Sequence, residues 1–266
     1  MSWADDRDRR VFGSDQITRQ GCEWYPSGEA ETTLFDFLSM PLFDGGAVLE
    51  RFRRLPGAIF REDSVCSKER FVYVPGVRLD RVVLVAHADT VFDFDYDCRV
   101  IQNRLYRDGS RIHSRGLPIG ADDRAGCALL WLLRGSGHSL LIVDGEEVGC
   151  VGSRWLMESN PDIASEINAH SFMVQFDRMH GTDFKTYDVG TEPFKRFISD
   201  ATGYSDAGAD SFTDICELCR GICGVNLSVG YYDPHTFHEY LDIDEWMHTL
   251  SAASCLIEGN LPQFRF

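Results

Sequence analysis

The chain has 266 residues, of which 44% are hydrophobic and 26% charged, a composition typical of a globular protein with a substantial core. Its formal net charge of −16 disfavours binding to nucleic acid or anionic membranes, because both ligands require basic surfaces. No apolar run approaches the ~20 residues that span a bilayer, and the N-terminal segment lacks the apolar centre of a secretory signal, so we expect a cytoplasmic protein.

The first part of the chain predicts a loose segment followed by two helices. Residues 1–29 are polar, contain Gly and Pro, and are expected to be loosely ordered. Over residues 31–55 the apolar side chains recur at helical spacing. Pro41, Gly45 and Gly46 interrupt this pattern and divide it into two helices.

The remainder of the chain alternates predicted strands with predicted helices. Residues 98–113 alternate in polarity around Asp108-Gly109, which indicates a hairpin or meander. Strands alternating with helices predict an α/β protein, a three-layer α/β/α sandwich around a mostly parallel mixed sheet. Strands are expected at residues 71–74, 81–87, 139–144, 172–176 and 222–229, and helices at 122–133, 152–159, 192–201, 211–219 and 240–257.

Side chains that can bind a metal ion follow the apolar strands. In such sheets the functional site lies beyond the carboxyl ends of the strands. Zinc binds His nitrogen and carboxylate oxygen, and two zinc ions can share one bridging carboxylate. The candidates are His87 and Asp89 after the first strand, Glu146 and Glu147 after the second, Asp177 and His235 after the later ones, and Asp122 before the first long helix.

Each of these residues taken singly has an ordinary explanation. A lone His at a strand end is usually a hydrogen-bonded core or loop residue, and Asp122 before a helix is usually a cap. Glu146-Glu147 is typical of a solvated turn, and Asp177 beside Arg178 of a surface ion pair. Their occurrence in order at successive strand ends favours one shared two-metal site.

The sequence resembles the co-catalytic di-zinc exopeptidases, the group of bacterial zinc aminopeptidases and the related carboxypeptidases and deacylases. The matching stretches are VVLVAHADTV, PIGADDRAG, IVDGEEVGCVGS, MVQFDR and VNLSVGYYDPHTFHEY, in this order between about residues 81 and 244. The resemblance implies the phosphorylase/hydrolase-like fold of these exopeptidases. It also implies two zinc ions per chain, although the ligand types would accept cobalt or manganese as well.

The resemblance assigns a role to each candidate residue. His87 and Asp177 would bind one zinc, and the carboxylate of Asp122 would bridge the two ions. The peptide bond between Asp122 and Asp123 would be cis. Asp89 would orient the imidazole of His87. Glu147 and His235, the latter in the pattern His-Thr-x-x-Glu, would bind the second zinc, and Glu146 would be the general base.

The spacing of the ligands indicates which relatives the chain resembles most. His235 follows Asp177 by 58 positions and Asp122 follows His87 by 35, which leaves no room for the inserted lid or dimerisation domain of the carboxypeptidase-like relatives. We therefore expect residues 1–266 to form a single catalytic domain. The predicted activity is removal of N-terminal residues from peptides by a water molecule activated between two zinc ions.

Two alternatives for the activity remain open at this point. One is a deacylase or carboxypeptidase that acts on N-acyl amino acids, and the other is a single-zinc acyltransferase that resembles glutaminyl cyclases. In each case the partner is a peptide or small amide, with no nucleic acid and no membrane, and the oligomeric state stays open. Nine cysteines without an export signal indicate reduced thiols, so we interpret Cys216, Cys219 and Cys223 as structural.

Overall fold

The structure is a computed structural model that describes residues 27–94 and 105–266. Nearly all of the segment predicted to be loosely ordered, residues 1–29, lies outside the described residues. The beginning of the predicted hairpin at residues 98–113 also lies outside them. Both of the two expected N-terminal helices are present, as α1 (Ser27–Leu38) and α2 (Gly46–Arg53), with the predicted interruption between them.

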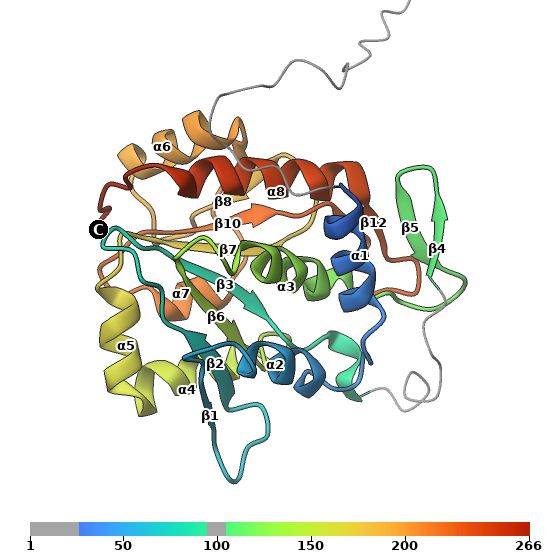
Figure 1. The fold of residues 1–266 in the computed structure, drawn as a ribbon, viewed down its shortest axis with the longest axis horizontal. Coiled ribbons are helices and arrows are strands. Elements are labelled where there is room, and N and C mark those ends of the chain that lie inside the picture. The colour runs from blue at the N-terminus through green and yellow to red at the C-terminus, as the bar shows by residue number, and fades with distance from the viewer. Residues whose placement is uncertain (1–26, 95–104) are drawn as a thin grey trace, which may run out of the picture.

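A mixed sheet of eight strands, parallel at its centre, forms the middle layer of the molecule (Figure 1). Its strand order is β1-β2-β6-β3-β7-β10-β8-β9, and the neighbours among β6, β3, β7 and β10 run parallel. The mostly parallel mixed sheet is confirmed. The strands are β1 (Ile59–Glu62), β2 (Arg70–Val74), β3 (Val83–His87), β6 (Ser139–Val143), β7 (Met173–Arg178), β8 (Asp183–Lys185), β9 (Ser205–Asp206) and β10 (Gly224–Ser228).

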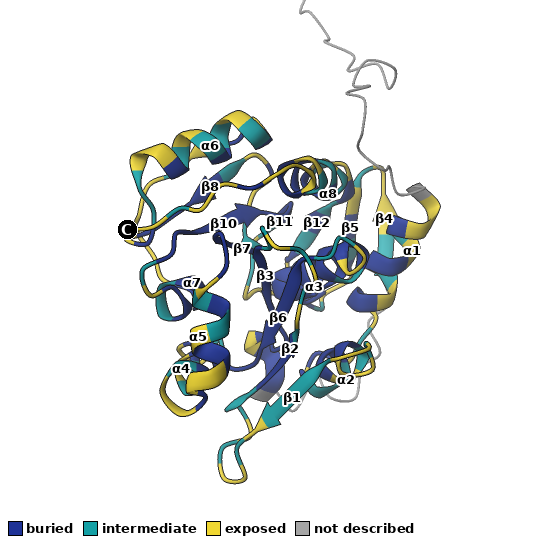
Figure 2. Ribbon diagram, turned by 60° about the vertical axis from the view of Figure 1, so that its left-hand side comes forward, coloured by how far each residue is buried: buried dark blue, intermediate teal, exposed yellow. Residues whose placement is uncertain are grey.

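Burial on both faces of the central strands produces two separate cores. In β3, Leu84 and Ala86 belong to one hydrophobic cluster while Val83 and Val85 belong to the other, because successive side chains point to opposite faces. Helices cover both faces, and Figure 2 shows the buried strands between them. The first core includes side chains of α1, α2, α3 (Ala121–Leu133), α6 (Glu192–Thr202) and α8 (Ile243–Glu258), and the second those of α4 (Val151–Ser159), α5 (Pro161–Asn168) and α7 (Asp214–Leu218).

A second, antiparallel sheet of four strands lies beside the central one. It has the order β11-β12-β5-β4 and contains the predicted hairpin, whose described part turns at Gly109 and Ser110. The helix predicted over residues 240–257 was wrong at its start, because residues 240–242 form a strand that pairs with β5. Asp242 ends that strand, and its side chain caps α8 by accepting from backbone N–H groups of the first helical turn. The strands are β4 (Leu105–Asp108), β5 (Arg111–Ser114), β11 (Tyr231–Tyr232) and β12 (Tyr240–Asp242).

Several short elements were not predicted. β1 is an edge strand with no fully buried residue, so it lacks the apolar run that marks the central strands. α5 begins at Pro161 directly after α4, where proline is compatible with the first helical turn. The helix predicted over residues 211–219 is limited to α7, and η1 (Val91–Phe94) is a single short 3-10 turn after β3.

The helices and the cysteines of the described residues bear on the predictions about membranes and thiols. Within residues 27–94 and 105–266, no helix combines the length and the apolarity that crossing a bilayer demands. The cysteines in these ranges are free thiols, in agreement with the prediction. Cys219 and Cys223 are buried in the two cores and Cys216 packs against the second, consistent with a structural role.

A buried histidine lies just before the amino-terminal end of β7. His170 is 2% exposed, and its Nδ1–H donates to the carbonyl of Glu166 at 2.8 Å. Its Nε2 accepts from Arg81 Nε at 3.0 Å and from Ser139 Oγ at 2.8 Å, so the ring is held neutral. Burial, with the nearby charge of Arg81, lowers the pKa of His170 to about 4.

This arrangement predicts a loss of stability in mild acid. The pKa of His170 is lower in the folded than in the unfolded chain, so its contribution is intact above about pH 6.5 and is lost as the pH falls toward 4. We expect the unfolding free energy to decrease by up to ~3 kcal/mol over that range. Urea unfolding at a series of pH values measures this change. The unfolding free energy of His170→Gln should depend less on pH than that of the parent, and His248→Gln, at an exposed site, should match the parent. Equal pH dependence in all three proteins would contradict this account.

Candidate metal centre

The predicted ligands lie together at the carboxyl ends of the central parallel strands. His87 is the last residue of β3, and Asp177 is the penultimate residue of β7. Glu147 lies in the loop after β6, Asp122 at the start of α3, and His235 in the loop between β11 and β12. Residues that are distant along the chain thus meet at one edge of the sheet, as the parallel arrangement of the strands requires.

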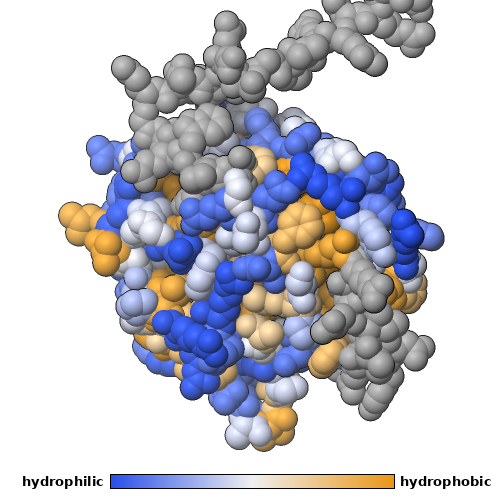
Figure 3. Space-filling view, turned by 45° about the vertical axis from the view of Figure 1, so that its right-hand side comes forward, coloured by the Kyte–Doolittle hydropathy of each residue, from blue (hydrophilic) through white to orange (hydrophobic). Residues whose placement is uncertain are grey.

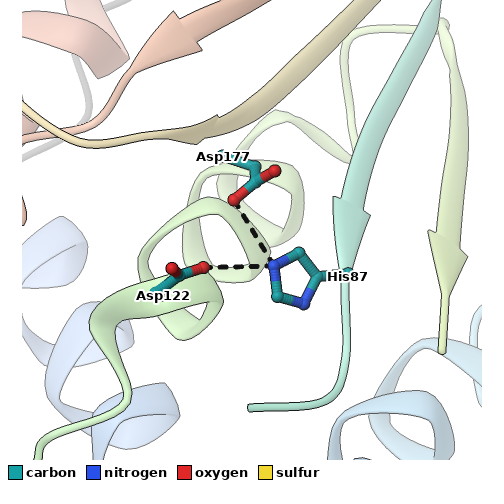
Figure 4. Close-up of side chains that lie close together, drawn as sticks. All are labelled: His87, Asp122 and Asp177. Carbon is teal, nitrogen blue, oxygen red and sulfur yellow. Dashed lines mark hydrogen bonds and ion pairs between the residues drawn. The ribbon is translucent and has the colours of Figure 1, made fainter. Parts of the chain in front are cut away.

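One group of atoms that could hold a metal ion includes the ring nitrogen Nε2 of His87 (Figure 4). His87 Nε2 lies 3.1 Å from Asp122 Oδ1 and 3.4 Å from Asp177 Oδ1. Two atoms that bind the same tetrahedral zinc at their usual distances lie about 3.4 Å apart. The spacing of these three side chains therefore fits a zinc ion among them.

A second group shares Asp122 with the first. His235 Nε2 lies 3.2 Å from the other oxygen of Asp122, Oδ2, and 3.0 Å from Glu147 Oε2. The ligand atoms of each group lie within 4.8 Å of one another. Asp122 thus offers one oxygen to each group, which is the geometry of a carboxylate that bridges two ions.

The neighbouring carboxylates favour the protonated form of both imidazoles. Burial alone would lower the pKa of His87, but the carboxylates of Asp177, Asp122 and Asp89 raise it above its usual value. Hydrogen bonds to Asp122 and Glu147 raise the pKa of His235 to about 10. The carboxylates that could hold a metal ion thus also favour a proton on each imidazole, so metal binding here should release protons.

Asp89 connects His87 to the loop that carries the two glutamates. Its Oδ1 lies 3.3 Å from His87 Nδ1, outside the alignment of a regular hydrogen bond. The same oxygen accepts from the backbone N–H groups of Gly145 and Glu146 at 2.9 and 3.1 Å, and Oδ2 accepts from that of Glu147 at 3.3 Å. One buried carboxylate thus binds the backbone of the glutamate loop and lies next to the imidazole of His87.

Asp177 is oriented by its neighbours in the fold and not by the arginine beside it. Its Oδ2 accepts from Thr213 Oγ1 at 2.7 Å and from Gln175 Nε2 at 3.0 Å. Arg178 pairs with Asp183 instead, at 2.8 Å. The ion pair with Arg178, the ordinary explanation for an aspartate at this position, is therefore absent from this region of the described structure.

The backbone around Asp122 is shaped by Asp123. The peptide bond between the two is cis, as the resemblance implied. The buried carboxylate of Asp123 accepts from the backbone N–H of His87 at 3.1 Å and from that of Gly126 at 3.0 Å. Asp123 thus joins the start of α3 to the end of β3.

Glu146, the predicted general base, is half-buried beside the two groups. Its Oε1 lies 3.9 Å from Cys150 Sγ. Burial, followed by the negative charge of Asp177, raises the pKa of Glu146 to about 10. Nearby divalent cations would favour the charged form, so a metal-loaded site can use this carboxylate as a proton acceptor.

Lys68 contacts carboxylates next to the glutamate loop and was not identified from the sequence. Its ammonium group bonds to Asp93, lies 3.0 Å from Asp144 Oδ1 and lies 3.9 Å from Asp89 Oδ2. Arg70 binds the other oxygen of Asp144, directly before the glutamate loop. Lys68 is one of several charged residues in a polar segment, so the sequence carries no signal that distinguishes it.

Comparisons with known proteins identify the fold. No protein-family profile and no curated protein matches the sequence. Among solved structures, aminopeptidase PepT from Bacillus cereus aligns with a TM-score of 0.64 and 14% identity over 88% of this chain and 98% of that chain. A tripeptidase from Staphylococcus aureus aligns with a TM-score of 0.65 and 13% identity over 89% and 99% of the two chains.

A third solved structure has the same fold. It is a candidate Zn-dependent exopeptidase from Bacteroides vulgatus, with a TM-score of 0.58 and 12% identity over 90% of this chain and 98% of that chain. The predicted fold class is confirmed by these three alignments. The chain has the fold of the aminopeptidase, tripeptidase and exopeptidase structures that it matches.

Proposed function

We propose that the chain is a di-zinc hydrolase that removes N-terminal residues from peptides. The observation that supports it most is the sharing of Asp122 between two groups of metal-binding atoms, each completed by one histidine and one further carboxylate. His87 and Asp177 would hold one ion, and Glu147 and His235 the other. The peptidase names of the solved structures with this fold support the same activity.

The chemistry divides between the ions and the side chains of the chain. When bound, the two zinc ions would polarise the scissile carbonyl and make a water molecule more acidic. Glu146 takes a proton from the attacking water and delivers it to the leaving amine. Asp89 keeps the imidazole of His87 and the backbone of Glu146 and Glu147 in register, so that ligand and base stay aligned.

Differences in exposure support entry of substrate from the side of His235. The side chain of His87 is fully buried, whereas that of His235 is 49% exposed. Exposed apolar residues adjoin this second group: Val148 follows Glu147, and Phe237 lies two positions after His235. Apolar residues lie exposed among polar ones on the side of the molecule toward which β3 runs (Figure 3), and they can contact peptide side chains.

We also propose that the catalytic unit works without an inserted domain. The residues between Asp177 and His235 supply β8, β9 and β10 of the central sheet, the helices α6 and α7, and β11 of the smaller sheet. These elements account for most of that interval, in keeping with the short spacing of the ligands.

The assay that tests this function compares free and blocked substrates. Zinc-loaded protein should hydrolyse aminoacyl amides and short peptides with a free N-terminus, and should lose this activity when zinc is removed by a chelator and regain it when zinc is restored. The matching N-acetylated compounds should be poor substrates. Rapid cleavage of N-acyl amino acids with no action on free peptides would instead establish a deacylase or carboxypeptidase, and cyclisation of N-terminal glutamine would establish an acyltransferase.

A further inference from the structure

A buried glutamate that has no place among the ligands joins two parts of the proposed metal centre. Glu239 is 1% exposed and lies directly before β12, four positions after His235. Its Oε2 accepts from the backbone N–H groups of Ile119 and Gly120 at 3.0 and 2.7 Å. Its Oε1 accepts from the backbone N–H of Asp122 at 3.1 Å.

The two segments that Glu239 joins are each shaped for this contact. Gly120 has a φ of 64°, which favours glycine, and a Cβ at this position would lie 2.4 Å from Leu42 Cδ2. In the loop of Glu239, Thr236 Oγ1 donates to the carbonyl of Asp233 at 2.8 Å and accepts from the backbone N–H of His238 at 3.1 Å. The carboxylate of Glu239 thus connects the loop of His235 to the segment that leads into α3.

We propose that Glu239 is a positioning residue that sets the distance between Asp122 and His235 and thereby the affinity of the site for both metal ions. Asp122 Oδ2 and His235 Nε2 lie 3.2 Å apart. The backbone of Asp122 is bonded to the carboxylate of Glu239, and Glu239 belongs to the same loop as His235. Asp122 and His235 are therefore connected twice: directly through their side chains, and through the bond from Glu239 to the backbone of Asp122.

The contacts require a carboxylate and not merely a polar side chain. Three N–H donors converge on two oxygens, and hydrogen bonds from N–H to a charged acceptor are stronger than those to a neutral one. A glutamine has the same size but supplies one oxygen and directs an NH₂ group at N–H donors. Glu239→Gln should displace the backbone of Asp122, and because Asp122 bridges both groups, both ions should bind more weakly.

The inference rests on the proposed metal centre and is tested by metal affinity before activity. Zinc binding to apo-protein is measured by competition with a chromophoric chelator for the parent, Glu239→Asp, Glu239→Gln and His235→Ala, and the folding of each apo-protein is checked by circular dichroism and thermal unfolding. We expect Glu239→Gln to weaken both zinc sites by about 10–100-fold, the range typical of residues that orient ligands. His235→Ala should weaken one site.

A matched control separates positioning from stability. Asp80→Asn alters a carboxylate that accepts from the backbone N–H of Leu261 at 2.9 Å before the opposite end of β3. This variant should lower the melting temperature and leave zinc affinity unchanged. With zinc saturating, Glu239→Gln should show a reduced kcat with a nearly unchanged KM, and Glu239→Asp should recover part of the lost zinc affinity.

The outcomes distinguish this inference from the proposed function. If the parent binds two zinc ions and Glu239→Gln binds them equally tightly, the positioning role is refuted while the metal centre survives. A Glu239→Gln protein that loses only thermal stability refutes the positioning role in the same way. If the parent binds no zinc, both the metal centre and the inference are refuted.

Discussion

Glu146→Gln is expected to abolish most of the hydrolytic activity while both metal ions stay bound. Glutamine keeps the size of the side chain but cannot accept a proton, and general acid–base catalysis contributes about 10²–10⁴-fold to the rate. We therefore expect kcat to fall by about that factor with KM little changed. The measurement is steady-state kinetics on an aminoacyl amide, together with the zinc content of the purified variant.

A control at an exposed position accompanies this variant. Glu158 is an exposed glutamate near the end of α4, and Glu158→Gln should keep the parental kcat and zinc content. Full activity of Glu146→Gln with two zinc ions bound would remove Glu146 from the proposed mechanism. Loss of zinc from this variant would make Glu146 a ligand instead of a base.

Asp122→Asn is expected to have the largest effect on metal content. Each oxygen of Asp122 faces a different histidine, with Oδ1 3.1 Å from His87 Nε2 and Oδ2 3.2 Å from His235 Nε2. An asparagine keeps one acceptor and places an NH₂ group in the other position, so it cannot bridge two cations. Zinc affinity should fall at both sites by more than about 100-fold, beyond the loss typical of residues that only orient ligands.

The control for Asp122→Asn is a variant of a residue that belongs to one group only. His235→Ala removes a side chain that belongs to one group only, so it should leave one tight zinc site. Elemental analysis after dialysis against a defined zinc concentration measures both variants. Equal zinc content in Asp122→Asn and His235→Ala would contradict a bridging role for Asp122.

The central sheet could be predicted because its strands are short apolar runs bounded by polar loops. β3 and β6 are buried along their whole length, and such strands have few alternative placements in an α/β fold. Once they are parallel neighbours, their carboxyl ends must lie at one edge. This is why His87 and Glu147, 60 positions apart, could be expected near each other from the sequence.

Short elements escaped prediction because tertiary pairing decides them. Residues 240–242 continue the apolar spacing of α8, but they form β12 because β5 offers its hydrogen-bonding edge to them. β8 and β9 have three and two residues, too few to establish a periodicity. In each case the local pattern fits more than one structure.

Residues that support the candidate site were harder to identify than the candidate ligands. Lys68, Thr213 and Glu239 act through contacts with segments far along the chain. The resemblance includes the pattern His-Thr-x-x-Glu, which contains Glu239, but the pattern alone does not say what its carboxylate touches. Only the arrangement in space reveals that it binds the backbone of Asp122.

The most direct test of the account is X-ray diffraction of zinc-loaded crystals with data collected on both sides of the zinc absorption edge. The account predicts two anomalous peaks per chain on either side of Asp122, one next to His87 and Asp177 and the other next to Glu147 and His235. Peaks at other positions, or no peak beside Asp122, would contradict the proposal of a two-metal centre.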